Sequence, residues 1–303
     1  MDWIELIDIQ GNAVIPKRLK RVAKYAFKDC EELRSIVIPS GVTTIAESAF
    51  EGCRNLKSVS FPSTLTKIDE CAFSRCESLE RIELPGSLKN TGVCAFSDCT
   101  SLREVVLTDG IEEISMHAFN GCTALQSIKL PNLVSIIKNR TFNECTSLSE
   151  VTLPDALTRL CVSAFGECES LRHIALPKDF ESFDTSAFYC CDLQIDVHPD
   201  NQYFCFENGC LLDKAKGILY YGNNHALIPE GVHTICQSAF SGMKELKKIV
   251  IPQSVKIIDR FAFSGCSSLV EVSIPDGLEK VGSWSFSGCP CEKEVLKKYE
   301  YKY

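Results

Sequence analysis

The feature that most constrains this chain is a sequence pattern that returns every 23 residues. Its most regular member is a phenylalanine, usually preceded by alanine, found at Phe27, Phe50, Phe73, Phe96, Phe119, Phe142, Phe165, Phe188, Phe240, Phe263 and Phe286. Only the step from Phe188 to Phe240 differs; it is 52 residues, or two repeats plus six. A short fixed period is typical of a solenoid, in which each coil contacts its neighbours. The 303 residues therefore predict one solenoid of about thirteen coils rather than two globular domains.

The other apolar residues share this period. Leucine recurs six residues after the phenylalanine, isoleucine or valine recurs nine residues after it (from Ile36 through Val197 to Val272), and most prolines share a third position. The stretch from Leu56 to Pro62 is typical of a short strand with alternating inward residues, which proline ends because it lacks an N–H. The Ala-Phe segment has room for only a turn or two of helix or 3-10 helix. The strands of successive coils must then pair in a parallel sheet, giving an α/β-type repeat solenoid.

These residues resemble the BspA-like, or treponemal-type, leucine-rich repeat family, whose pattern is C-x-x-L-x-x-I-x-L-P-x-x-L-x-x-I-x-x-x-A-F. Single repeats depart from it at Thr91, Thr108, Thr141 and Met243. The resemblance implies a leucine-rich-repeat horseshoe, with parallel strands on the concave face and short helical or 3-10 turns elsewhere. It also covers the long step, where Pro199 to Tyr203 and Asn208 to Tyr221 are similar to a β-hairpin insertion that the family carries. Such proteins are often cell-surface or secreted recognition and adhesion modules.

The repeat positions divide the expected solenoid into segments. We expect an N-terminal cap over residues 1–18, regular repeats over 19–194, an interrupted repeat with a β-hairpin insertion over 195–228, regular repeats over 229–289, and a C-terminal cap or frayed tail over 290–303. Caps are expected because the first and last coils would otherwise expose core and open strand edges.

Charge and hydropathy exclude several classes of partner. The net charge is −8 with no block of lysine or arginine, so the chain lacks what nucleic-acid binding requires. No run of about 18 apolar residues is available to insert into a membrane. The first residues carry acids where a signal peptide carries basic residues, which predicts a cytoplasmic protein as the chain is written. The resembled family implies the alternative, a cell-surface or secreted protein.

The residues on either side of each inward strand position are candidates for binding a protein ligand. They lie eight and ten residues after the phenylalanine. The predicted contact residues among them are Ser60, Arg81, Glu83, Glu104, Val106, Lys129, Glu150, Thr152 and His173. The alternative is a merely solvated sheet face, since strands favour such residues for pairing alone.

The insertion adds aromatic residues that the strands lack. Tyr203, Phe206, Tyr220 and Tyr221 are expected to contact a partner if the hairpin projects. The alternative is that these rings seal the junction where the repeat is interrupted.

Cysteine is unusually frequent, with 18 in the chain, and ten of them lie three residues after a repeat phenylalanine. We expect buried reduced thiols that donate to backbone carbonyls, with some disulfides or a metal site as alternatives. The cysteines outside this position carry the rival function, a thiol-active or metal-binding protein; they include Cys190, Cys205, Cys210, Cys236 and Cys291.

No motif for catalysis or phosphate binding is present, and the five histidines share no position in the repeat. We therefore expect a non-catalytic scaffold for protein–protein interaction or adhesion, without a cofactor. Its partner is an unidentified protein ligand and a monomer is favoured. A structural element of a larger surface assembly is a further alternative.

Overall fold

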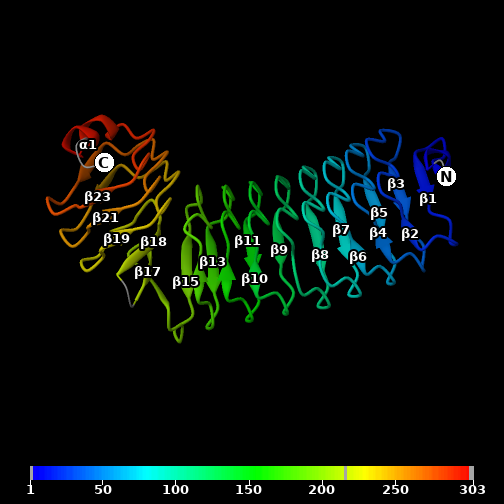
Figure 1. Ribbon diagram of the computed structural model, residues 1–303, viewed down its shortest axis with the longest axis horizontal. Coiled ribbons are helices and arrows are strands. Elements are labelled where there is room, and N and C mark those ends of the chain that lie inside the picture. The colour runs from blue at the N-terminus through cyan, green and yellow to red at the C-terminus, as the bar shows by residue number, and fades with distance from the viewer. Residues whose placement is uncertain (1–2, 215–216, 300–303) are drawn as a thin grey trace. The chain divides into compact units, whose positions relative to one another are not determined.

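The computed structural model describes residues 3–214 and 217–299. The chain divides into two compact units, Met1–Ser170 and Leu171–Tyr303. Within each unit, the short strands of successive coils pair in parallel, side by side (Figure 1). The predicted parallel-strand solenoid with its 23-residue period is confirmed. The continuity of one solenoid from residue 1 to residue 303 stays a prediction.

In the first unit, the longest strand of each coil lies on what we call the strand face. These strands are β1 (Asn12–Val14), β3 (Ser35–Val37), β5 (Ser58–Ser60), β7 (Arg81–Leu84), β8 (Glu104–Leu107), β9 (Ser127–Lys129) and β11 (Glu150–Thr152). The first five form one sheet in that order, and β9 pairs with β11. Residues 23 apart lie opposite each other, such as Ser35 and Ser58. The pairing therefore places equivalent side chains of successive coils in straight rows.

A second row of two-residue strands lies on another side of the coils. In the first unit they are β2 (Arg21–Val22), β4 (Thr44–Ile45), β6 (Lys67–Ile68), β10 (Ile136–Ile137) and β12 (Arg159–Leu160). A parallel bridge between Asn90 and Glu113 takes their place in the coils between β6 and β10. Each of these short strands buries its second residue, because alternation turns that side chain toward the core.

The Ala-Phe segments are hydrogen-bonded turns rather than helices. Two residues in each turn except the one around Phe188 have left-handed backbone, such as Tyr25 (φ 59°) and Asp29 (φ 56°) on either side of Phe27. A left-handed residue cannot continue a right-handed helix, so the segment stays a turn. In the described part of the chain, helix occurs only as the 3-10 helix η1 (Ile4–Leu6) and as α1 (Glu292–Tyr299).

The repeat phenylalanines form the centre of the core. In the first unit the rings of Phe27, Phe50, Phe73, Phe96, Phe119, Phe142 and Phe165 are fully buried. Neighbouring rings are nearly parallel, with centroids 4.8 to 5.7 Å apart. The edge of Trp3 packs on Phe27, so the N-terminal segment covers the first ring of the stack. The predicted cap of residues 1–18 includes residues 1 and 2, which lie outside the described residues.

The second unit contains the same two kinds of strand. On one side lie the pairs β13–β15 and β20–β22, with the bounds His173–Leu176, Gln194–Val197, Lys248–Val250 and Glu271–Ser273. The two-residue strands are β14 (Ser182–Phe183), β19 (Thr234–Ile235), β21 (Ile257–Ile258) and β23 (Lys280–Val281). Phe240, Phe263 and Phe286 form a second ring stack.

The insertion folds as three antiparallel strands rather than as one hairpin. They are β16 (Phe204–Glu207), β17 (Cys210–Asp213) and β18 (Ile218–Gly222). Asn208 and Gly209 join the first two, and both have left-handed backbone, as a two-residue type I′ turn requires. Strand β18 then pairs in parallel with β19. The insertion is therefore continuous with the row of short strands that follows it.

The C-terminal end of the second unit carries helix α1 within the predicted cap or tail of residues 290–303. Val295 of this helix is buried, and with Cys291 it lines a small pocket beside Val272 and Ile274. Residues 300–303 lie outside the described residues.

Candidate functional site

The strand face of the first unit contains a hollow between β5 and β7. It has a volume of about 550 Å³ and is lined by Ser58, Val59, Ser60, Phe61, Ser63, Arg81, Glu83, Leu84, Pro85 and Thr108. Three predicted contact residues, Ser60, Arg81 and Glu83, therefore lie around one depression. Phe61, Pro85 and Thr108 also line it, although their repeat positions did not predict them as contact residues.

The hollow forms where two strands stop pairing. β5 and β7 share a single pair of opposed residues, Ser58 and Arg81, whereas β7 and β8 share four. Phe61 follows β5, and its half-buried ring packs edge-on against Phe73 with centroids 5.5 Å apart. The equivalent residue in the next coil is the smaller Leu84. The strands are thus tied at Ser58 and separate toward the aromatic ring.

Charges of both signs surround the hollow. The Arg81 guanidinium is 3.2 Å from the Glu83 carboxylate and 2.9 Å from the Glu104 carboxylate. The hydrogen bond to Glu104, then that to Glu83, raises the pKa of Arg81, which stays a cation. All three side chains are at least half exposed, so the group is hydrated and contributes little to stability. Its charges remain available to a partner.

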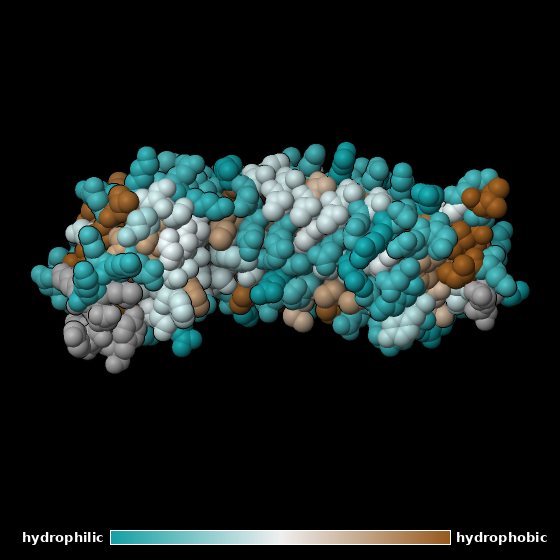
Figure 2. Space-filling view, turned by 90° about the horizontal axis from the view of Figure 1, so that it is seen from above, coloured by the Kyte–Doolittle hydropathy of each residue, from teal (hydrophilic) through white to brown (hydrophobic). Residues whose placement is uncertain are grey.

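The other predicted strand-face residues of the first unit lie beyond this group. Val106 is half-buried on β8, whereas Lys129, Glu150 and Thr152 are exposed on β9 and β11. Lys129 lies directly opposite Thr152. The strand face is therefore apolar at its start, where Val14 and Val37 are exposed, and charged from Arg81 onward. On the face of the molecule drawn in Figure 2, hydrophilic surface predominates, and apolar patches are visible toward both ends of the view.

His173 belongs to the second unit. It lies on β13, and its Nε2 is 2.8 Å from the carboxylate of Asp196 on β15. Asp196 was not predicted from the sequence, because the coil that contains Phe188 is short. There the opposed residues Ile174 and Ile195 are 21 apart instead of 23, so Ile195 is buried where Val197 was expected. The shortening is visible in the sequence, because Leu193 follows Cys191 by two residues, whereas the leucine follows the cysteine by three in the other repeats that have both.

The insertion aromatics have different environments. Tyr203 is 47% exposed, Phe206 and Tyr220 are half-buried, and Tyr221 is only 3% exposed. The Tyr221 hydroxyl donates to the Cys191 carbonyl (2.9 Å) and accepts from the Leu193 amide (2.6 Å). The prediction that Tyr221 contacts a partner is therefore wrong, because this ring closes the interrupted repeat. The expected junction role applies to Tyr221, and Tyr203 is the most exposed of these four rings.

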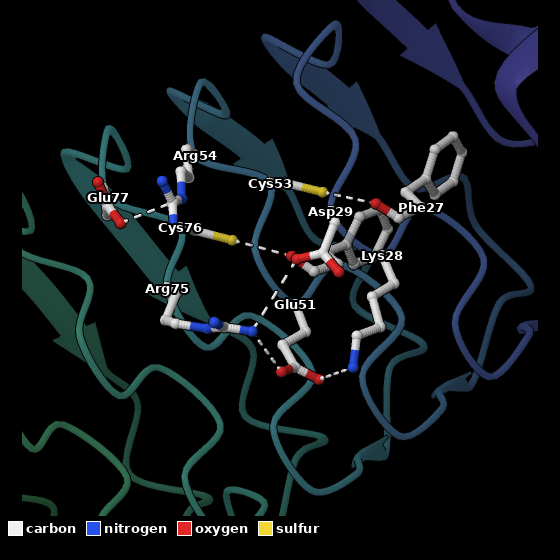
Figure 3. A network of polar contacts seen from close by, with 10 residues as sticks. Phe27, Lys28, Asp29, Glu51, Cys53, Arg54, Arg75, Cys76 and Glu77 are labelled. Carbon is white, nitrogen blue, oxygen red and sulfur yellow. Dashed lines mark hydrogen bonds and ion pairs between the residues drawn. The ribbon is translucent and has the colours of Figure 1, made fainter.

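The repeat cysteines form a ladder of buried thiols. The ladder thiols from Cys53 to Cys168, together with Cys266 and Cys289, each donate to the carbonyl of the phenylalanine 26 residues before them, as Cys53 does to Phe27 at 2.9 Å and Cys76 to Phe50 at 3.2 Å (Figure 3). Cys30 donates to the Glu32 carboxylate. Burial raises the pKa of Cys53 and Cys99 to about 12. These thiols are protonated near neutral pH, so they pack and donate rather than act as nucleophiles.

The cysteines outside the ladder provide weak support for the rival function. Burial raises the pKa of Cys210 and Cys236 to about 12, and it also raises the pKa of Cys205. Across residues 3–214 and 217–299, no three His, Cys, Asp or Glu side chains are grouped so that they could hold a metal ion.

Surface charges form a second ladder at the turns. Glu51 is 2.9 Å from the Lys28 ammonium and 2.7 Å from the Arg75 guanidinium, so one carboxylate links the coils before and after its own (Figure 3). The hydrogen bonds from Lys28, Ser48 and Arg75 lower the pKa of Glu51, although its partial burial opposes them as the largest single effect. This network is structural, since it joins neighbouring coils without forming a hollow.

One protein family matches most of the chain. The model of the BspA type leucine rich repeat region matches residues 10–124, 94–211 and 222–300. The chain belongs to this family. The resemblance that its sequence suggested is confirmed.

Solved structures include other leucine-rich repeat proteins of bacteria. One from Bacteroides ovatus is 29% identical with a TM-score of 0.68, over 97% of this chain and 83% of that one. A leucine rich cell surface protein from Faecalibacterium prausnitzii is 26% identical with a TM-score of 0.77, over 93% and 77%. The T. pallidum leucine rich repeat protein is 35% identical with a TM-score of 0.51, over 53% and 78%. No curated protein sequence matches the chain.

Repeat proteins of the BspA type are generally scaffolds for protein interaction or for surfaces. The described helices of this member are all too short or too polar to cross a membrane.

Proposed function

We propose that this chain is a non-catalytic scaffold that binds a protein ligand on the strand face of its first unit. The observation that carries the proposal is the hollow between β5 and β7, where Ser60, Arg81 and Glu83, which the repeat positions had predicted as contact residues, surround one depression. Concave sites with a few polar groups at their rim are typical of binding surfaces.

The chemistry of the hollow indicates what such a ligand offers. The ring of Phe61 forms an apolar part of the lining, while Arg81 and Glu83 present opposite charges beside it. A partner segment with one apolar side chain and flanking charges of both signs matches this arrangement. Because the strands are fixed by parallel pairing to their neighbours, little backbone ordering accompanies binding.

Two further parts of the proposal rest on other observations. Phe206 lines a second pocket, of about 360 Å³, with His198, Cys205 and Lys214, and it forms a secondary contact area in the second unit. The similarity to a cell-surface protein of F. prausnitzii supports adhesion at the cell surface over the cytoplasmic alternative. Labelling intact source cells with an antibody against this chain tests the location; signal only after lysis contradicts the surface role.

Peptide selection against the wild-type protein tests the binding surface. We expect selected peptides to lose binding to a triple variant, Glu83→Lys, Lys129→Glu and Glu150→Lys. The matched control, Lys89→Glu, Glu112→Lys and Glu47→Lys, makes the same net change away from the strand face and should bind normally. Equal binding to all three proteins, or a failure to select any peptide, contradicts the proposal.

A second candidate is a structural element of a larger surface assembly. The exposed apolar residues Ile9 (99% exposed), Val14 and Val37 near the N-terminal end favour it, because association of chains would cover them. Light scattering that shows no growth with concentration contradicts this candidate.

A further inference from the structure

The second unit contains a pocket whose lining is aromatic and acidic. It has a volume of about 420 Å³ and is lined by Glu181, Ser182, Phe183, Gln202, Tyr203, Phe204, Asp213 and Tyr220. Four of these eight residues are aromatic, and they come from β14, β16, β18 and the residue before β16. The insertion thus brings together rings that the regular repeats do not possess.

The rings stand at steep angles to one another. Tyr220 meets Phe183 at 81°, with centroids 6.1 Å apart, and meets Phe204 at 79°, with centroids 5.6 Å apart. Rings that meet edge to face form walls at right angles, whereas the stacked rings of the core cover each other's faces. Phe183 and Phe204 are almost wholly buried, whereas Tyr203 is 47% exposed. The pocket therefore has fixed inner walls and one ring at its mouth.

The charged side chains among the described residues of the lining are both acidic. Glu181 and Asp213 are acidic, and no basic side chain is found among the described residues that line the pocket. The hollow on the strand face and the pocket beside Phe206 differ, since the first includes Arg81 and the second includes Lys214. Tyr220 also stays neutral at physiological pH, because burial raises its pKa to about 12. Its hydroxyl donates a hydrogen bond to the Asp213 carboxylate at 3.5 Å, so this carboxylate lies beside one of the aromatic rings.

We propose that this pocket, which we call the aromatic pocket, binds a trimethylammonium group. Such a cation has no N–H to donate, is weakly hydrated and is attracted to the faces of aromatic rings, while nearby carboxylates neutralise its charge. A primary ammonium is strongly hydrated and fits rings less well. A small molecule and the side chain of a trimethylated lysine both carry this group, so the chemistry recognised is the same.

The experiment is a calorimetric titration of the full chain with choline and with its neutral isostere, 3,3-dimethylbutan-1-ol. The two ligands have nearly the same shape, so the difference isolates the charge. We expect saturable binding of choline, at least about tenfold tighter than the isostere. Absence of saturable choline binding, or equal affinity for the isostere, overturns the proposal.

Two matched pairs of variants locate the site. Tyr203→Ala should weaken choline binding about tenfold, whereas Tyr25→Ala, which removes a similarly exposed ring in the first unit, should leave it unchanged. Glu181→Gln should weaken it about threefold, whereas Glu207→Gln, on β16 but not in the pocket lining, should have no effect. These targets are exposed, so the variants should fold. Equal effects within each pair overturn the site.

A short peptide containing trimethyllysine distinguishes the two sources of the cation. Tighter binding of this peptide than of choline indicates a protein side chain as the natural ligand, and the reverse indicates a small molecule. The proposal is independent of the strand face, because reversing Glu83, Lys129 and Glu150 should not change choline affinity. Loss of choline binding in that triple variant contradicts a separate site.

Discussion

The regular coils of the first unit and the insertion of the second unit bury aromatic rings in different ways. From Phe27 to Phe142, each phenylalanine stacks on its equivalents and is tied to the next coil through its backbone. The Phe27 amide donates to Ala49 (2.8 Å), and its carbonyl accepts the Cys53 thiol (2.9 Å). The same contacts recur in the following coils, so the stability of the unit is spread over equivalent interfaces.

Around the insertion, single residues replace that recurring pattern. The Asn201 side chain is 1% exposed; its amide group donates to the carbonyls of Pro177, Lys178 and Phe180, and its oxygen accepts from the amides of Tyr203 and Phe204. Tyr221 makes comparable contacts at the other end of the insertion. In the regular coils, each contact has equivalents in neighbouring coils. The interruption instead depends on single residues whose contacts the regular repeats do not reproduce.

The largest effect is expected in the middle of the first stack. Phe96→Ala should lower the free energy of unfolding by about 3–5 kcal/mol, because it removes a buried ring from between two others. Urea denaturation measures this loss, with Tyr25→Ala as an exposed control near zero. A loss for Phe96→Ala below about 1 kcal/mol would mean that the stack does not carry the core.

The insertion should depend on one polar side chain. Asn201→Ala leaves several buried backbone groups without partners and should cost about 3 kcal/mol, confined to the second unit. Hydrogen exchange should show faster exchange at the Tyr203 and Phe204 amides and unchanged protection in the first unit. As a control, Asn55→Ala removes one exposed bond to Glu31 and should be nearly neutral. Unchanged exchange at Tyr203 would contradict the comparison.

The thiol ladder predicts a loss of stability in base. Unfolded cysteines ionise near pH 9.0, whereas burial raises the pKa of folded Cys99 to about 12. The unfolded state therefore loses protons first, and stability falls as the pH rises from 9 toward 12. One unit above the unfolded pKa, each such thiol should remove about 1.4 kcal/mol. Urea midpoints between pH 7 and 10 should fall less steeply for Cys99→Ser, and an identical slope would count against the ladder.

The smallest effect is expected from exposed ion pairs. Lys248 and Glu271 of the second unit are 2.8 Å apart and mostly exposed, as are Arg81 and Glu104 of the first. Lys248→Ala and Arg81→Ala should each leave the urea midpoint unchanged within error, because water and salt screen such pairs. A clear loss for Arg81→Ala alone would assign the hollow a structural role instead of a binding one.

The periodic part of the fold could be predicted from the sequence because each regular coil buries apolar side chains at the same positions of the repeat. Phe73, Leu79 and Ile82 each recur in register, so pattern alone identified the core. The prediction failed at Val197, where a shortened coil moved the buried position to Ile195. A fixed count of residues cannot follow a coil that has lost some of them.

The candidate sites were less accessible to sequence reasoning. The hollow depends on where β5 and β7 stop pairing, and no residue pattern encodes that point. For Tyr221 a signal was present, since Leu219 and Tyr221 alternate with Tyr220 and share the buried side of β18. The aromatic pocket joins Glu181 to residues more than twenty positions away. That contact follows from how the insertion folds back, which the sequence does not state.

The link between each phenylalanine and the coil that follows it has a direction. The N–H of Phe50 reaches forward to Ala72, as that of Phe27 does to Ala49, so the coils from Phe50 to Phe142 offer this same donor to the coil after them and the same acceptor to the coil before them. A duplicated coil inserted between two interior coils can therefore form the same hydrogen bonds with both of them. A gene encoding such a protein can gain or lose whole coils and keep its fold, adjusting the length of the surface that it presents.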